Sequence, residues 1–181
     1  MTDAAIDPAT DRDLELMAAQ LGRTMRGVLG IGARCVCGAP TVVVTRPRLP
    51  DGTPFPTFYY LTHPAATASA SRLEADGTMA ELQEQLRDPA IAQAYAAAHA
   101  AYLADREAHG HVEEIAGISA GGMPTRVKCL HAVLAHTLAA GPGVNPIGDR
   151  TLELGDWSPE QCVCAPEARG AADDGPASRG R

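Results

Sequence analysis

The sequence has few aromatic residues and no long apolar segment. Aromatic residues make up 4% of the 181 residues and hydrophobic residues 45%, so the core must be built from aliphatic side chains and alanine. No apolar run approaches the roughly 20 residues that a membrane-spanning helix needs. The first residues, MTDAAIDPATDRDLE, are acidic and lack the basic and apolar regions of a signal peptide. We therefore expect a cytoplasmic chain without a membrane partner.

Basic residues are also in short supply. Lys and Arg total 15 against 22 Asp and Glu, the formal net charge is −7, and Lys128 is the only lysine. Proteins that bind nucleic acid usually show a basic patch or stripe, and none is evident here. The expected partners are therefore a small molecule or another protein, and nucleic acid is not among them. The oligomeric state stays open.

The chain lacks the paired CxxC pattern of common zinc-binding motifs, although it contains five cysteines. An odd number of cysteines in a cytoplasmic protein indicates reduced thiols rather than structural disulfides. The tripeptide CVC occurs twice, at 35–37 and 162–164, but the flanking residues differ. We interpret this repetition as coincidence.

Hydrophobic periodicity and turn residues predict one α+β domain over residues 11–150. Apolar residues at helical spacing predict a helix from Asp11 to near Gly22. The stretches 41–45 and 57–62 are rich in β-branched and aromatic residues, and the Pro-Asp-Gly turn between them predicts a hairpin. The glycine-rich residues that precede this hairpin are expected to be irregular or to form a brief strand.

Helices dominate the remainder of the expected domain. They are predicted over 65–75, 79–87, 89–109 and 125–140, whereas 141–149, GPGVNPIGD, is predicted to be a loop. Residues 1–10 are expected to be flexible and residues 151–181 to be poorly ordered, since the second segment has no apolar periodicity. The predicted fold is a small antiparallel hairpin or sheet packed against four or five helices, with a disordered C-terminal tail.

Several unusual blocks resemble a known family. They are RCVCGAP, TRPRLPDGTPFPTFYYLTHP, SAGGMPTRVKCLHAVLAH and GPGVNPIGD, and together they resemble the actinobacterial domain of unknown function 501 family. The resemblance covers roughly residues 11–150 and assigns no catalytic residue. It implies a gene neighbourhood with enolase, a septum-formation initiator and an exopolyphosphatase-like protein, which favours a phosphate-related or division-related role.

The stretch SAGGMPTRVK, residues 119–128, is typical of a loop that holds an anion. Glycines before a helix let backbone N–H groups converge, and the helix N-terminus carries partial positive charge. We therefore expect a small phosphate- or carboxylate-bearing ligand here, with His63 approaching from the hairpin. The alternative is a loop that only caps a core helix, and the P-loop spacing is absent. The expected ligand-binding residues are Ser119, Gly121, Gly122, Thr125, Arg126, Lys128 and Arg48.

A zinc site is a further alternative, with thiolate and imidazole ligands from Cys35, Cys37, Cys129 and His131. The spacing does not favour it, because residues two apart on a regular helix diverge. Cys129 and His131 reach one ion only if the segment around them is not yet helical. An arrangement in which Cys129 joins Cys35 and Cys37 stays open, as does the reading of all these residues as buried, reduced thiols.

Acid–base or thiol chemistry has two candidate residues, His63 and Cys129. Cys129 is predicted to lie beyond the first helical turn, where the helix dipole stabilises a thiolate only weakly. His63 lies at a strand-to-helix junction, where a capping role is the alternative. Whether the chain is an enzyme stays open. The first hypothesis is binding of a small anionic ligand. The others are a non-enzymatic protein-interaction factor, connected with cell division, and a zinc-stabilised domain.

Overall fold

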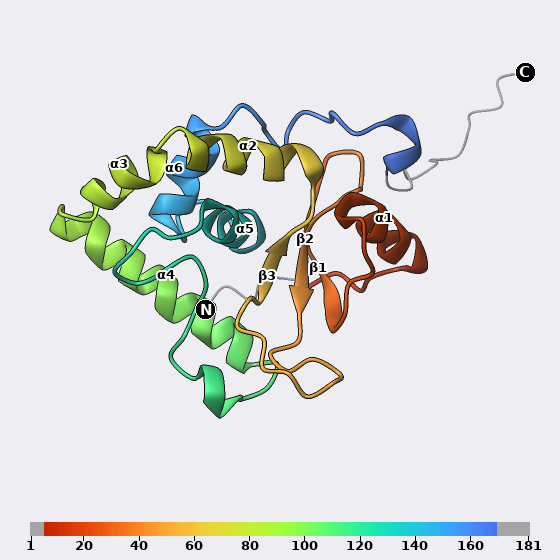
Figure 1. Ribbon diagram of the computed structural model, residues 1–181, viewed down its shortest axis with the longest axis horizontal. Helices are drawn as coiled ribbons and strands as arrows, with labels where there is room; N and C mark the ends of the chain where they lie inside the picture. The colour runs from red at the N-terminus through yellow and green to blue at the C-terminus, as the bar shows by residue number, and fades with distance from the viewer. Residues whose placement is uncertain (1–5, 170–181) are drawn as a thin grey trace, which may run out of the picture.

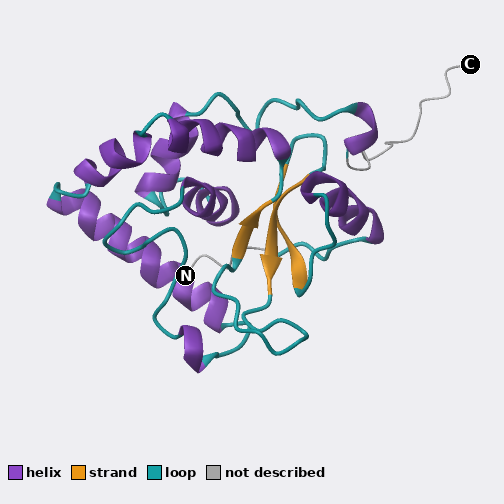
Figure 2. Ribbon diagram, viewed as in Figure 1, coloured by secondary structure: helices purple, strands orange, loops and turns teal. Residues whose placement is uncertain are grey.

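A three-stranded antiparallel sheet lies between helices in the computed structural model, which describes residues 6–169. Its strands, in the order β1-β2-β3, are β1 (Val28–Arg34), β2 (Pro40–Thr45) and β3 (Tyr59–Leu61). The predicted hairpin is confirmed as the β2–β3 pair, and the glycine-rich stretch before it supplies β1. Every residue of β2 is buried. This burial follows from the helices that flank the sheet on both sides (Figure 2).

The helical part of the described chain has six α-helices and two short 3-10 helices. They are α1 (Asp11–Leu21), α2 (Pro64–Ala75), α3 (Thr78–Gln85), α4 (Pro89–Glu107), η1 (Glu113–Ile115), α5 (Leu130–Ala140), α6 (Pro146–Leu154) and η2 (Pro166–Ala168). Thr10 opens α1 with a capping box, and proline begins α2, α4 and α6, where its missing N–H costs nothing. The predicted α+β class is confirmed.

The core is organised around α5. In β2, Val42 and Val44 belong to the main core cluster with α5, while Val43 packs under α1 on the opposite face, as strand alternation requires. Most residues of α5 are buried, so this helix has to be covered on all sides. Figure 1 shows α5 nearly end-on, between the sheet and the helices α2, α4 and α6.

Two helix boundaries in this part of the chain differ from the prediction. α5 begins at Leu130 rather than at Thr125, because the residues before it form a closed loop. α6 begins at Pro146, inside the stretch 141–149 that was predicted to be a loop. The side chain of Asn145 accepts a hydrogen bond from the amide of Gly148 and caps α6. Asn145 and Pro146 begin a helix here, but the same residue types are common in turns, which is why the sequence was interpreted as a loop.

The ordered part of the chain extends beyond the predicted limits. α6 continues past residue 150 and Trp157 is buried, so the expected tail does not begin at 151. At the other end, the amide of Asp7 donates to the carbonyl of Ile31 at 3.0 Å and the reciprocal bond measures 2.8 Å. Residues 1–5 and 170–181, which complete the segments predicted to be flexible, lie outside the described residues.

Among the helices of residues 6–169, none combines the length and the apolar character that a membrane crossing requires. This agrees with the absence of long apolar runs in the sequence.

Arg106 is a buried charge that joins α4 to two loops. Its side chain is 2% exposed, and its guanidinium donates to the carbonyl oxygens of Ile115 at 2.8 Å and Pro56 at 3.3 Å, and to that of Ile118. The loop before β3 and the loop after η1 are thus held by one cation. A guanidinium is suited to this role because it has five N–H donors in a fixed plane.

Arg106→Met is expected to lower the free energy of unfolding by about 3 kcal/mol, because it leaves buried carbonyl oxygens without donors. The control is Arg87→Met, since the Arg87 side chain is 80% exposed and pairs with Glu84 at the surface. That change is expected to cost less than about 0.5 kcal/mol. Urea unfolding measures both values, and equal midpoints for the two variants would contradict the structural role of Arg106.

Candidate metal centre

The two CVC tripeptides, 35–37 and 162–164, meet in the structure. The sulfur atoms of Cys35, Cys37, Cys162 and Cys164 all lie within 4.8 Å of one another. The Sγ atoms of Cys35 and Cys164 are 3.9 Å apart, although 129 positions separate the two residues in the chain. The interpretation of the repeat as coincidence was therefore wrong.

The first cysteine pair lies in the tight turn between β1 and β2. The amide of Cys35 donates to the carbonyl of Ala39 at 2.9 Å, and the amide of Gly38 donates to the carbonyl of Cys35 at 2.8 Å. Gly38 has a φ of 84°, in the left-handed region that favours glycine. Val36 between the cysteines is 64% exposed. The turn thus places the valine in solvent and both thiols in the cluster.

The second pair lies on a segment of the described chain that has neither helix nor strand. Before the cysteines, Trp157 is buried against the ring of His63, with 5.1 Å between centroids. After them, Arg12 of α1 donates to the carbonyl of Glu167 at 2.6 Å. The segment is anchored on both sides of the cysteines, and these anchors lay it across the β1–β2 turn.

Hydrogen bonds to sulfur favour a thiolate at one position of the cluster. Burial raises the pKa of Cys37, but the amide of Ala39 and the thiols of Cys162, Cys164 and Cys35 donate to its sulfur and lower the pKa to about 7. Burial raises the pKa of Cys35 and of Cys164. Of these three thiols, Cys37 therefore ionises first as the pH rises.

His63 contacts the cluster from the start of α2. Its Nε2 lies 3.1 Å from the Sγ of Cys164, and its Nδ1 accepts from the amide of Ala66 at 3.5 Å. Burial lowers the pKa of His63, which favours the neutral ring. Because Nδ1 accepts, we assign the proton to Nε2, where it points at sulfur. His63 thus has the capping role that was the alternative for it, and its catalytic role stays a prediction.

A second cluster lies at the start of α5. The Sγ of Cys129 is 4.0 Å from the Nδ1 of His131, and the Oε1 of Glu74 is 3.1 Å from the same nitrogen. All three ligand atoms lie within 4.8 Å of one another. This is possible because Cys129 precedes the helix in an extended conformation, with φ −151° and ψ 113°. The condition under which Cys129 and His131 can share an ion is therefore met.

The four metal candidates of the sequence divide between these two clusters. Cys35 and Cys37 join the second CVC, and Cys129 and His131 join Glu74. A single site formed by all four candidates is thus contradicted, as is the arrangement of Cys129 with Cys35 and Cys37. The hydrogen bond to Cys129 raises the pKa of His131, burial lowers it, and Glu74 raises it further, to about 9.

The predicted anion loop is closed by its own hydrogen bonds. Within 119–128, the amide of Lys128 donates to the carbonyl of Gly121 at 2.8 Å, and that of Arg126 to the carbonyl of Gly122 at 3.0 Å. The amide of Val127 donates to the side chain of Gln83 at 2.8 Å. The loop also precedes α5 without forming its first turn. The amides of the second half of the loop are thus engaged within the protein.

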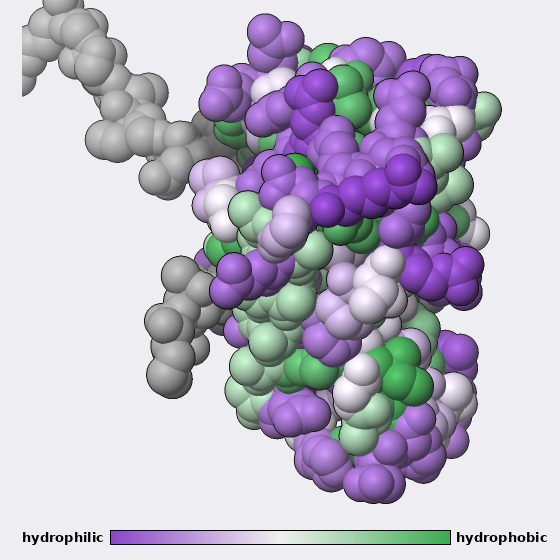
Figure 3. Space-filling model, turned by 90° about the vertical axis from the view of Figure 1, so that its left-hand side faces the viewer, coloured by the Kyte–Doolittle hydropathy of each residue, from purple (hydrophilic) through white to green (hydrophobic). Residues whose placement is uncertain are grey.

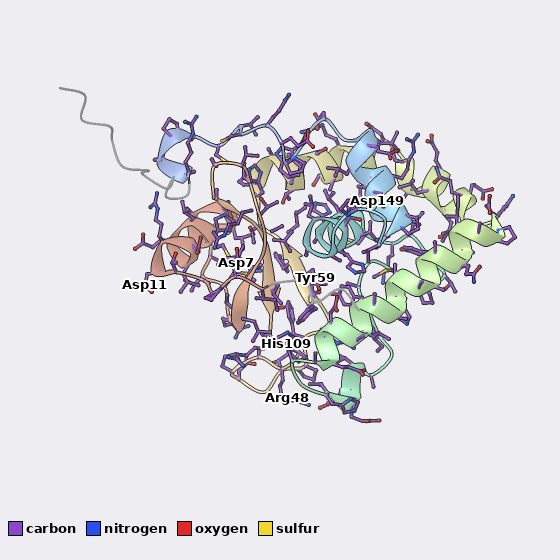
Figure 4. The ribbon with its side chains drawn as sticks, turned by 180° about the vertical axis from the view of Figure 1, so that it is seen from behind. Asp7, Asp11, Arg48, Tyr59, His109 and Asp149 are labelled. Atoms are coloured by element: carbon purple, nitrogen blue, oxygen red, sulfur yellow. The ribbon has the colours of Figure 1, made fainter. Side chains whose placement is uncertain are left out.

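Two other residues predicted to bind the anion, Ser119 and Arg48, have partners outside the loop. The hydroxyl of Ser119 forms a hydrogen bond of 2.8 Å with Nδ1 of His99. Thr125, later in the loop, is exposed. Arg48 pairs with Glu114 at 2.6 Å. Figure 4 shows Arg48 at the lower edge of the molecule, away from α5. Arg48 and His63 therefore do not converge on the loop, and that part of the prediction was wrong.

Residues 31–153 match the family described as Protein of unknown function (DUF501), which is more than half of the chain. The chain belongs to this family. No curated protein and no solved structure matches it. The DUF501 region contains the first CVC and the whole Glu74 cluster but ends before the second CVC. The four-cysteine cluster thus joins the family region to the segment that follows it.

Sequence reasoning on the DUF501 chain missed Cys162, Cys164 and Glu74. The repeated CVC was the available signal for the two cysteines, and it was set aside because the flanks differ. Glu74 had no local signal, since it is one of several carboxylates on predicted helices.

In metal-free, reduced protein, Cys37 is expected to react with iodoacetamide before Cys35 and Cys164. The thiolate is the reactive form, so modification of Cys37 should accelerate as the pH rises through about 7. Cys164, whose pKa is raised, should require a higher pH. Peptide mass spectrometry over a pH series measures the order. Modification of Cys164 ahead of Cys37 at neutral pH would show that the charge lies elsewhere.

Proposed function

We propose that this chain is a zinc-binding protein in which Cys35, Cys37, Cys162 and Cys164 hold one ion as four thiolates. The observation that carries the proposal is the convergence of the two CVC tripeptides. Four sulfur ligands in a tetrahedral arrangement are typical of structural zinc sites. The ion would fasten the C-terminal segment to the β1–β2 turn.

The spacing of the sulfur atoms suits zinc. A Zn–S bond of about 2.3 Å in tetrahedral geometry requires sulfur atoms about 3.8 Å apart. The sulfurs of Cys35 and Cys164 are 3.9 Å apart, and the remaining sulfur–sulfur distances are at most 4.8 Å. Four protein ligands leave no coordination position for water or substrate, so such a site stabilises structure rather than performing chemistry.

Hydrogen-bond donors around the sulfurs support the same assignment. The amide of Cys37 donates to the sulfur of Cys35, and the amide of Ala39 donates to that of Cys37. Nε2 of His63 lies against the sulfur of Cys164. Donors of this kind stabilise thiolates and orient the ligands, and metal sites commonly have such hydrogen bonds behind their ligands.

Zinc at this cluster would stabilise the fold, because a complete ligand set exists only when the β1–β2 turn and the segment around residues 162–164 are both in place. If the free ion exceeds its Kd by a factor of about 1,000, the gain is about 4 kcal/mol. For a C-terminal segment without helix or strand around its cysteines, this is a substantial contribution.

The other two hypotheses stay predictions. The amides of Arg126, Val127 and Lys128 donate within the protein, which leaves fewer donors for an anion at the 119–128 loop. A continuous apolar surface would support the hypothesis of a protein-interaction factor. On the face drawn in Figure 3, hydrophilic and apolar side chains are intermixed. Neither hypothesis has an observation comparable with the four converging thiols.

Purified protein is expected to hold one tightly bound zinc ion per chain after extensive dialysis. Cys164→Ser and Cys37→Ser should lose this ion and unfold with a free energy lower by about 4 kcal/mol. The control is His111→Ala, which removes a possible zinc ligand that pairs with Glu113 at the surface and belongs to neither cluster. Elemental analysis and urea unfolding give the result. Protein without tightly bound metal, or tightly bound zinc that persists in Cys129→Ser/Cys164→Ser, which lacks one thiol in each cluster, would refute the proposal. Tightly bound iron would refute the choice of zinc.

His63→Phe is expected to weaken zinc binding about tenfold while leaving the stoichiometry at one, because it removes the N–H donor but keeps a ring against Trp157. The control is His111→Phe, since the His111 side chain is 60% exposed and pairs with Glu113 at the surface. Competition with a chromophoric chelator measures the affinity. Equal affinities for the two variants would mean that His63 serves only as a helix cap.

A further inference from the structure

We propose that Glu74, Cys129 and His131 form a second metal site, which binds a zinc-class divalent ion and leaves one coordination position open to a groove along β3. The open position would take water or a single donor atom of a small ligand, such as a carboxylate oxygen or a thiolate sulfur. This site is independent of the four-cysteine cluster and differs from it in having room for a ligand.

The three ligand atoms converge in a way that suits an ion better than a proton relay. In a relay, the nucleophile and the orienting carboxylate occupy opposite ring nitrogens of the histidine. Here the Sγ of Cys129, at 4.0 Å, and the Oε1 of Glu74, at 3.1 Å, both approach Nδ1 of His131. A single ion between these atoms would satisfy all three at once. Thiolate, imidazole and carboxylate are the usual zinc ligands.

Hydrogen bonds behind the ligands leave Nδ1 free to coordinate. Nε2 of His131 lies 3.1 Å from the hydroxyl of Ser71, which can hold the ring proton on Nε2. The amide of Leu130 donates to Oε1 of Glu74 at 2.7 Å and fixes the carboxylate. Helix α2 contributes the ligand Glu74 and the supporting hydroxyl of Ser71. Cys129 and His131 lie at the start of α5, so two packed helices hold the site.

The site is open on one side. The side chains of His131 and Glu74 are 27% and 26% exposed, so solvent reaches them. Cys129 and His131 line a groove of about 430 Å³, which also borders Tyr60 and Leu61 of β3, the strand at the end of the sheet. Sites with three protein ligands keep a fourth position for water or substrate.

The groove also contains a polar group in need of a partner. The hydroxyl of Thr67, on α2, lines the groove, is buried, and has no hydrogen-bond partner among the described residues. A buried hydroxyl without a partner is costly, and a bound ligand or an ordered water would supply one. A donor and acceptor thus lies in the same groove as Cys129 and His131.

The test adds cobalt to protein whose four-cysteine cluster is already filled with zinc, which is spectroscopically silent. We expect one further equivalent of cobalt per chain, with a thiolate-to-cobalt charge-transfer band. Azide, a small anion that binds open positions, should then change the visible spectrum of the bound cobalt. Absence of this additional equivalent would overturn the site, and a spectrum insensitive to azide would overturn the open position.

Variants separate the ligands from their surroundings. Cys129→Ser should abolish the charge-transfer band, and Glu74→Gln should weaken cobalt binding at least about tenfold while its amide oxygen still accepts from Leu130. His111→Ala is the control, because that histidine pairs with Glu113 at the surface. A band that persists in Cys129→Ser would assign the cobalt to other thiols and overturn the proposal.

The same titration in Cys162→Ser/Cys164→Ser protein distinguishes this site from the first. If the second site is real, that variant still binds one azide-sensitive cobalt with a single-thiolate spectrum. Cobalt binding in this variant together with an absence of tight zinc in the wild type would refute the four-cysteine site alone. Tight zinc in the wild type without the azide-sensitive cobalt would refute the Glu74 site alone.

Discussion

The requirement to bury α5 on every side determines where the two clusters lie. The sheet covers one side of α5, and α2 packs beside it in the same core. α2 follows β3 almost directly, so His63 is fixed next to the β1–β2 turn while the far end of α2 reaches the start of α5. The four-cysteine cluster therefore contacts one end of α2 and the Glu74 cluster the other. At 1.5 Å per residue, His63 and Glu74 are about 16 Å apart along the helix.

The same helix also anchors the C-terminal segment. Arg72 donates to the carboxylate of Asp156 at 2.5 Å, and the hydroxyl of Ser69 accepts from the amide of Asp156 at 3.1 Å. Because these contacts directly precede Trp157, the path of the chain toward Cys162 is set before the cysteines are reached. The convergence of the thiols is thus a consequence of packing on α2, and a metal would complete an arrangement that the fold has already prepared.

Local signals in the sequence were sufficient for most elements. The β-branched run of β2, the turn after it and the helices α2 and α4 were predicted because each depends on residues a few positions apart. The start of α5 was missed because it depends on Glu74, whose carboxylate accepts from Leu130 across 56 positions. α6 was missed since its cap, Asn145, and its first proline are also turn residues.

The two clusters of possible metal ligands were not predicted from local patterns for the same reason. Spacing rules for zinc motifs describe ligands brought together by one turn, as for Cys35 and Cys37. They carry no information on a partner pair 129 positions away. The identity of the two tripeptides was the only trace of that pairing in the sequence. Its value depends on the tertiary path of the C-terminal segment, which neither periodicity nor composition encodes.

The charge of the proposed zinc site connects it to folding. Four thiolates and one Zn²⁺ carry two net negative charges, in a chain whose formal net charge is already −7. The nearest arginine in sequence, Arg34, is engaged by Asp13 at 2.7 Å and donates to the carbonyl of Gly38 at 3.0 Å. Arg34 therefore stabilises the turn through the carbonyl of Gly38, while its charge is paired with Asp13 rather than with the thiolates. The negative charge of the site is therefore stabilised by the N–H groups of the turn and of His63. These groups point at sulfur only when β1, β2 and α2 are in their native positions. Since dipoles act only at short range and in the correct orientation, affinity for the metal and formation of this part of the fold should rise and fall together.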